Sequence, residues 1–100
     1  MRHYEAMYIV DPDTDDEGLE LVVAKYSTVV TNGGGEVTDS SKWERGRRPL
    51  AYTISGKREG IYILMQFVSE AEVPAELDRI FRINEDVLRH IIVRQDDDEE

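Results

Sequence analysis

The residues with the most evident chemistry in this 100-residue chain are cations gathered between Lys42 and Arg58. This segment holds six of the twelve Lys and Arg residues, and Glu44 is its only acidic member, although the formal net charge is −10. The Arg guanidinium is a planar fork that pairs two phosphate or carboxylate oxygens at once. The segment is therefore predicted to bind anions, either phosphates of a nucleic acid or acidic side chains of a protein. Its cations are Lys42, Arg45, Arg47, Arg48, Lys57 and Arg58.

Further cations are scattered along the chain at Arg2, Arg79, Arg82, Arg89 and Arg94. The negative net charge does not exclude a nucleic-acid partner, because charges are screened beyond about 8 Å at physiological salt. Five of the negative charges lie in the last five residues, so the rest of the chain carries −10 + 5 = −5. The alternative to anion binding is a solvated face with local salt bridges, which the near absence of acidic neighbours disfavours.

Catalysis and metal binding have little support in the sequence. His3 and His90 are single histidines without a neighbouring nucleophile or metal-ligand spacing. The acidic run "DPDTDDEG" at residues 11–18 fails as a calcium loop, because the twelfth position, which needs Glu, is Ala24 or Val22. Capping and the helix dipole account for acidic residues at a helix start. The chain is predicted to be no enzyme and to have no cofactor, no metal and no small-molecule substrate.

Composition also limits the compartment. The chain contains no Cys, which fits a reducing compartment. Its start, "MRHYEAMYIV", lacks the pattern of a signal peptide. No stretch approaches the roughly 18 consecutive apolar residues of a membrane span. A cytoplasmic protein without membrane contact is expected.

Hydrophobic periodicity predicts the elements that position these residues. Thr14 and Glu17 have capping-box spacing at the start of a first helix, and Asn32-Gly33 can adopt the left-handed conformation that ends it. A second helix is expected to have Pro74 at its first position and Asn84 as its stop. A polar turn containing Gly56 joins the two middle strands. The strands are predicted at residues 4–10, 36–43, 49–54, 60–68 and 87–93, and the second helix at 74–83.

The order β-α-β-β-α-β predicts an α+β, ferredoxin-like fold, a four-stranded antiparallel sheet with two helices on one face. Residues 1–95 are expected to form this single domain, and 96–100 an acidic disordered tail. We expect the first, third and last strands to meet at the centre of the sheet, which would place Arg2 near the last strand.

The second face of such a sheet has no helix over it, yet two strands are apolar on both faces. These are "IYILMQFV" at residues 61–68 and "VLRHIIV" at 87–93. An exposed apolar patch on a small domain usually marks an interface, so a partner protein or self-association is predicted. Base stacking, as in the RNA recognition motif, is not expected, because Ile61 stands where that motif has an aromatic residue.

Four motifs together resemble the bacterial small-subunit ribosomal protein six family, over about residues 2–94. They are "RHYE" at residues 2–5, "GRRPLAYTI" at 46–54, "GIY" at 60–62 and "RINEDVLRHIIVR" at 82–94. The chain departs from the family pattern in three ways. Trp43 is separated from Gly46 by two residues, Thr53 stands where proline is frequent, and the tail is short. The first departure leaves the role of Trp43 open.

The resemblance implies a non-catalytic, ribosome-bound protein of the small subunit. It implies binding to the central domain of small-subunit ribosomal RNA as a heterodimer with ribosomal protein eighteen. By motif position it implies RNA contacts for Arg2, Tyr4, Arg89 and Arg94, and RNA or partner contacts for Arg45, Arg47, Arg48, Lys57 and Arg58. The competing hypothesis is a self-associating ferredoxin-like domain that binds a small molecule or serves as an enzyme subunit.

Overall fold

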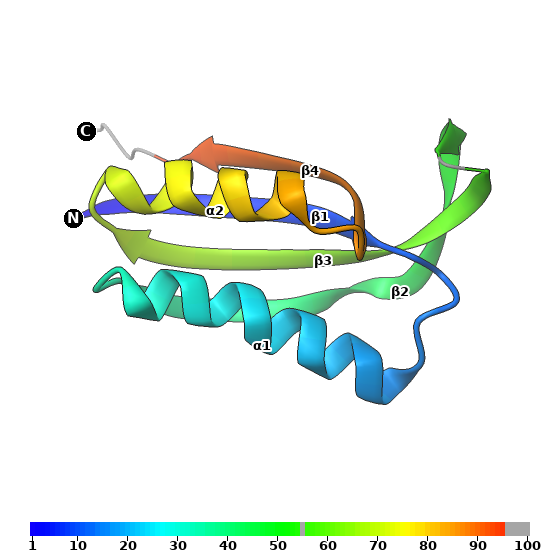
Figure 1. Ribbon diagram of the computed structural model, residues 1–100, viewed down its shortest axis with the longest axis horizontal. Helices are drawn as coiled ribbons and strands as arrows, with labels where there is room; N and C mark the ends of the chain where they lie inside the picture. The colour runs from blue at the N-terminus through cyan, green and yellow to red at the C-terminus, as the bar shows by residue number, and fades with distance from the viewer. Residues whose placement is uncertain (55, 96–100) are drawn as a thin grey trace.

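The computed structural model describes residues 1–54 and 56–95, with side chains for residues 1–40, 56 and 58–95. Six elements follow in the order β-α-β-β-α-β, and the four strands form one antiparallel sheet with the order β2-β3-β1-β4. Both helices lie on the same face of this sheet (Figure 1). The predicted ferredoxin-like fold is confirmed. The elements are β1 Arg2–Val10, α1 Asp16–Asn32, β2 Glu36–Ile54, β3 Lys57–Ser69, α2 Glu72–Ile83 and β4 Val87–Arg94.

The core lies between the helices and the sheet. Alternate residues of β1 and β3 face it because successive side chains of a strand point to opposite faces. Three aromatic rings fill its centre: the centroids of Tyr8 and Tyr26 are 5.3 Å apart, and Phe81 lies 5.1 Å from Tyr8 and 4.4 Å from Tyr26. The strand residues buried there are Tyr4, Ala6, Tyr8, Val10, Ile61, Ile63, Met65 and Phe67.

The first helix begins one residue later than the sequence pattern indicated. Asp15 is the N-cap, and its carboxylate accepts a 2.8 Å hydrogen bond from the N–H of Gly18. The predicted capping box of Thr14 and Glu17 is therefore wrong. Thr14 instead closes a turn, its N–H donating to the carbonyl of Asp11. Two adjacent residues suited to capping make such a shift invisible in the sequence.

The end of α1 also differs in detail from the prediction. Gly33 is the C-cap but has φ −88°, and Gly34, with φ +87°, takes the left-handed conformation. Gly35 has no room for a side chain: a Cβ there would lie 2.8 Å from Ser69 Cβ and from the Val68 carbonyl oxygen. The three glycines are therefore a fixed turn that lets β2 enter close beside β3.

The second helix begins at Glu72, before the predicted start at Pro74, and ends at Ile83 with Asn84 as its C-cap. Pro74 fits the third helical position because the first N–H groups of a helix have no intrahelical acceptor. The two strands predicted at 36–43 and 49–54 are one strand, β2, which pairs with β3 through three register shifts. Strand β4 lies at the sheet edge, and only β1 and β3 are central, so its predicted central position is wrong.

Candidate functional site

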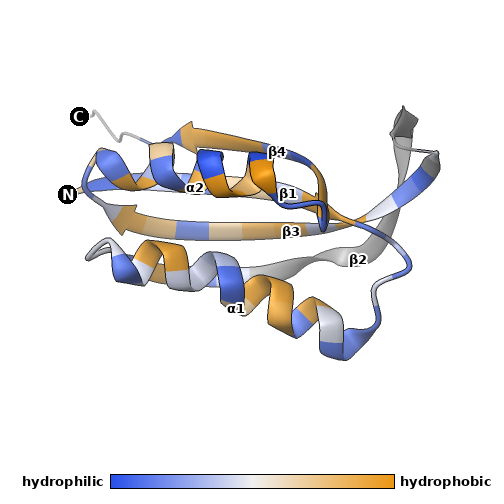
Figure 2. Cartoon of the chain, viewed as in Figure 1, coloured by the Kyte–Doolittle hydropathy of each residue, from blue (hydrophilic) through white to orange (hydrophobic). Residues whose placement is uncertain are grey.

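The open face of the sheet carries an apolar surface that no helix covers. Ile91 and Val93 of β4 are the most exposed apolar side chains on it, at 55% and 45%. The register places them opposite Met7 and Glu5 of β1. We define the apolar patch by its members that share this face, which are Met7, Ile9, Tyr62, Leu64, Val68, Ile91 and Val93. The predicted apolar face is confirmed, and Figure 2 shows the hydrophobic colouring along β4 and β3.

The acidic side chain of Glu5 lies on this face, at the centre of the sheet. Glu5 accepts hydrogen bonds from the amide groups of Gln66, at 3.3 Å, and Gln95, at 3.0 Å. Glu5 thus connects β3, β1 and the residue that follows β4. The carboxylate is held within the sheet by these two amides beside the apolar patch.

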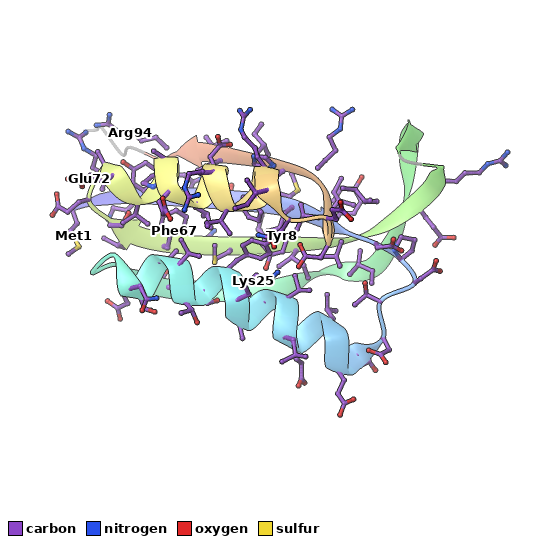
Figure 3. All side chains as sticks on the ribbon, in the orientation of Figure 1. Met1, Tyr8, Lys25, Phe67, Glu72 and Arg94 are labelled. Atoms are coloured by element: carbon purple, nitrogen blue, oxygen red, sulfur yellow. The ribbon has the colours of Figure 1, made fainter. Side chains whose placement is uncertain are left out.

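Three of the four residues predicted to contact RNA lie at the end of the sheet where the chain begins. Arg94 is paired with Tyr4 across β4 and β1, and Arg2 is two residues before Tyr4. Figure 3 shows Arg94 near Met1, at the same end of the molecule. Arg2 and Arg94 are exposed, whereas Tyr4 is 7% exposed with its ring stacked on Phe67 at 5.4 Å. Tyr4 can therefore offer a ligand only the rim of its ring.

Arg89 is separated from that group. It is exposed and pairs with Ile9, so it lies on the open face beside the apolar patch. Arg89 and Arg94 are five residues apart in the strand, a distance of roughly 16 Å. Because the odd-numbered and even-numbered residues of β4 face opposite ways, Arg94 lies toward the helices instead.

The cation segment is only partly described. Arg47 and Arg48 occupy β2 positions paired with Ile61 and Gly60 at the far end of the sheet, and Arg58 of β3 is exposed there. The β2–β3 hairpin extends away from the helices, far from the start of β1 and the end of β4 (Figure 1). The side chains of Arg45, Arg47, Arg48 and Lys57, and the tail predicted at 96–100, lie outside the described residues.

A groove runs between α2 and β4, with a volume of about 610 Å³. Within it, Asp78 Oδ1 lies 2.6 Å from His90 Nε2, and Asp78 Oδ2 accepts a 2.8 Å hydrogen bond from Arg82. The hydrogen bonds with His90 and Arg82 hold the pKa of Asp78 below its usual value. The groove is lined by Tyr4, Pro74, Ala75, Asp78, Arg82, His90, Ile91, Ile92 and Arg94.

Two scattered cations are neutralised by neighbours on their own helix. Arg79 donates to both carboxylate oxygens of Glu76, at 3.0 and 2.7 Å, and Arg82 binds Asp78. These pairs have the i,i+3 and i,i+4 spacing that brings helical side chains together. That spacing was a signal in the sequence, and it separates the helix cations from those of the sheet. No spacing rule could have shown the contact between Asp78 and His90.

Among the residues that the structure describes, no three His, Cys, Asp or Glu side chains are arranged to hold a metal ion. No helix within the described ranges combines the length and the apolar character needed to cross a membrane.

Comparison with known proteins identifies the family. The model of the family described as "Ribosomal protein S6" matches residues 3–94. The chain belongs to the ribosomal protein S6 family. It is 47% identical to small ribosomal subunit protein bS6 of Clostridium acetobutylicum, over 93% of this chain and 96% of that protein. It is also 47% identical to small ribosomal subunit protein bS6 of Desulforamulus reducens, over 95% and 98% of the two chains.

The fold agrees with a solved structure of the ribosomal protein S6 family. The crystal structure of 30S ribosomal protein S6 from Thermotoga maritima matches with a TM-score of 0.86 and 25% identity, covering 94% of this chain and 87% of that chain. The predicted family is therefore confirmed. These S6 relatives are ribosomal proteins and not enzymes, as the sequence predicted for this chain.

Proposed function

We propose that the chain binds the central domain of small-subunit ribosomal RNA together with ribosomal protein eighteen, as a ribosome-bound heterodimer in the cytoplasm. The observation that carries the proposal is the apolar patch on the open face. Ile91 and Val93 are about half exposed there and no helix covers them. A patch of this kind on a small domain supports a protein partner.

Exposed cations of the sheet support an RNA contact. Arg89 lies on the open face itself, and Arg2 and Arg94 are exposed at one end of the sheet. Phosphate contacts come chiefly from such side chains and position a protein without reading sequence. We assign RNA contact to Arg2, Arg89, Arg94 and the ring edge of Tyr4. Arg45, Arg47, Arg48, Lys57 and Arg58 are assigned to RNA or to the partner.

One group of acidic residues lies away from these cations. The start of α1 carries Asp15, Asp16 and Glu17, and it is at the opposite end of the molecule from the start of β1 and the end of β4 (Figure 1). Like charge would keep RNA from that end. We also propose that residues 1–95 are one domain and that 96–100 form a separate acidic tail.

Affinity measurements on a central-domain fragment of the ribosomal RNA, with and without ribosomal protein eighteen, test the proposal. We expect the partner to strengthen binding, and we expect affinity to fall steeply between about 50 and 200 mM salt because bound phosphates release counterions. If the affinity for RNA does not depend on salt, the proposed phosphate contacts are wrong. If it does not depend on ribosomal protein eighteen, the proposed heterodimer is wrong.

A further inference from the structure

Strand β4 ends the sheet on one side. In the order β2-β3-β1-β4 its inner side pairs with β1, and no other strand within residues 1–54 and 56–95 lies on its outer side. An edge strand presents backbone N–H and C=O groups that can pair with another extended chain. The structure shows which residues of β4 present them.

One hydrogen bond fixes the direction of these groups. The N–H of Gln95 donates to the carbonyl of His3 at 2.7 Å, so the backbone of Gln95 points toward β1. In an antiparallel pair, alternate residues direct their backbone groups to the partner and the residues between them direct theirs away. The backbone groups of His90, Ile92 and Arg94 therefore point to the outer side of the sheet.

The two edges of the sheet differ in regularity. Along β2 the register shifts between Val37 and Asp39, between Lys42 and Arg47, and between Pro49 and Ile54. Bulges and proline are devices that keep an edge strand from pairing with another chain. Strand β4 pairs with β1 without a shift from Arg89 to Arg94 and contains no proline. Only the β4 edge is therefore built to accept a further strand.

The surroundings of β4 specify what such a strand would carry. Its side chains would alternate between the open face, next to Ile91 and Val93, and the groove between α2 and β4. The side chains of the added strand on the open face would extend the apolar patch. Its side chains in the groove would meet Arg82 and Arg94, and Asp78 there is already bound by Arg82 and His90.

We propose that β4 accepts an extended segment of the protein partner as a fifth strand, with apolar side chains beside the patch and polar or acidic side chains in the groove. This proposal rests on the proposed function, because it names how that partner is held. Main-chain hydrogen bonds give affinity in such strand addition, and side-chain pockets give specificity.

Charge disfavours a second copy, and composition disfavours the tail. Two copies of this chain would each bring a net charge of −10, so they would repel each other. The acidic residues after Gln95 have no apolar side chain that could extend the patch. A separate protein with an alternating apolar segment meets both requirements.

Amide hydrogen exchange of the full chain, alone and with ribosomal protein eighteen, tests the proposal. The amides of His90 and Ile92 should exchange at least about tenfold more slowly in the complex. A matched pair of variants supplies a second measurement. Arg94→Ala and Arg94→Pro both remove the guanidinium, but only proline removes the outward N–H. The proline variant should bind the partner about tenfold more weakly than the alanine variant.

The outcomes separate this proposal from the proposed function. If a complex forms with both variants equally and the two amides exchange at an unchanged rate, strand addition is wrong and the partner covers only the open face. If no complex forms, both proposals are wrong. Protection that appears with rising concentration of the chain alone would assign the edge to a second copy. Protection of the monomer that disappears when residues 96–100 are deleted would assign it to the tail.

Discussion

Tyr26 of α1 and Asp86, the residue before β4, lie 60 residues apart, and the Tyr26 hydroxyl donates a 2.7 Å hydrogen bond to Asp86 Oδ1. The second carboxylate oxygen accepts from Lys25 Nζ at 2.6 Å. The Tyr26 ring is fully buried against Phe81, so this bond connects the surface loop before β4 to the centre of the core. Figure 3 shows Lys25 on the side of α1 that faces the sheet and α2.

Removing the Tyr26 hydroxyl should destabilise the fold. Tyr26→Phe leaves Asp86 with one fewer donor, and we expect a loss of about 1–2 kcal/mol in the free energy of unfolding, measured in urea. Tyr8→Phe is the matched control. The Tyr8 hydroxyl is buried and has no hydrogen-bond partner among the described residues. Its removal should leave the free energy of unfolding unchanged or raise it, because a buried hydroxyl without a partner costs stability. Equal effects of the two variants would contradict the assigned role of Asp86.

The free energy of unfolding should fall in acid, because the carboxylate of Asp86 becomes protonated there. Burial alone would raise the pKa of Asp86, but hydrogen bonds from Lys25 and Tyr26 outweigh it and hold the pKa below its usual value. A lowered folded-state pKa gives stability that is fully present above the unfolded pKa of about 3.9 and is lost as pH falls through the folded pKa. We therefore expect the free energy of unfolding to decrease below about pH 4.

Urea unfolding at successive pH values measures this decrease. Asp86→Asn cannot titrate at this position, so its stability should fall less over the same range. The remaining fall is expected from Asp78 and Glu76, whose pKa values are lowered by hydrogen bonds with His90 and Arg79 respectively. A variant that loses stability as steeply as the original chain would show that Asp86 makes no contribution.

The turn after α1 allows a test of packing against backbone strain. Gly35→Ala places a Cβ against the Val68 carbonyl oxygen, which cannot move without disturbing β3. The expected cost is about 2–3 kcal/mol. Gly34→Ala meets no atom within 4 Å and should cost only about 1–2 kcal/mol, for its positive φ. Asn tolerates positive φ, so Gly34→Asn should recover stability whereas Gly35→Asn should not. Thermal unfolding of the four variants distinguishes the two causes.

The fold was predictable because its patterns are local. Alternation in β1 and the helical stripe from Leu19 to Val30 each follow from the sequence alone. The N-cap of α1 could not be predicted, because Thr14 and Asp15 are both good N-cap residues. Only the geometry of the turn from Asp11 selects between them. Hydrophobic alternation divided β2 into two predicted strands, because its register shifts interrupt the alternation that marks a strand.

The candidate site was predictable in composition and not in arrangement. The sequence indicated an apolar open face, which Ile91 and Val93 confirm. The odd spacing of Arg89 and Arg94 already places them on opposite faces of one strand, but only the register with β1 shows that Arg89 is the one on the open face. The sequence also could not show that the Tyr4 ring is buried, since an aromatic residue at a strand end suits a core and a surface equally.

The apolar patch should determine affinity for the partner. Ile91→Lys places a charge at the centre of the proposed interface, and we expect binding of ribosomal protein eighteen to weaken by about tenfold or more. Leu21→Lys is the matched control, because Leu21 is 72% exposed on α1, in the opposite layer. Both variants should keep the unfolding free energy of the original chain within about 0.5 kcal/mol. Titration calorimetry with ribosomal protein eighteen, in the absence of RNA, measures both affinities. If the two variants bind that protein equally well, the apolar patch is not the interface.

Arg89 should contribute a phosphate contact to RNA binding. Its substitution by Ala is expected to lower affinity for the ribosomal RNA fragment in the presence of the partner. Removal of one phosphate contact should also reduce the slope of log affinity against log salt by about 0.7–0.9. Arg79→Ala is the control, because Arg79 lies on α2 and is held by Glu76 through two hydrogen bonds. Filter binding at four or five salt concentrations gives both quantities.

The same measurement separates RNA from protein as the ligand of Arg89. If Arg89 contacts an acidic side chain of ribosomal protein eighteen, the variant will weaken binding of that protein in the absence of RNA, and the salt slope for RNA will not change. Arg2→Ala, at the end of β1, extends the test to the cations near Arg94. If neither Arg89→Ala nor Arg2→Ala alters affinity for RNA or its salt slope, the assigned RNA contacts are wrong, and the phosphates must be bound by the Arg residues of the β2–β3 hairpin.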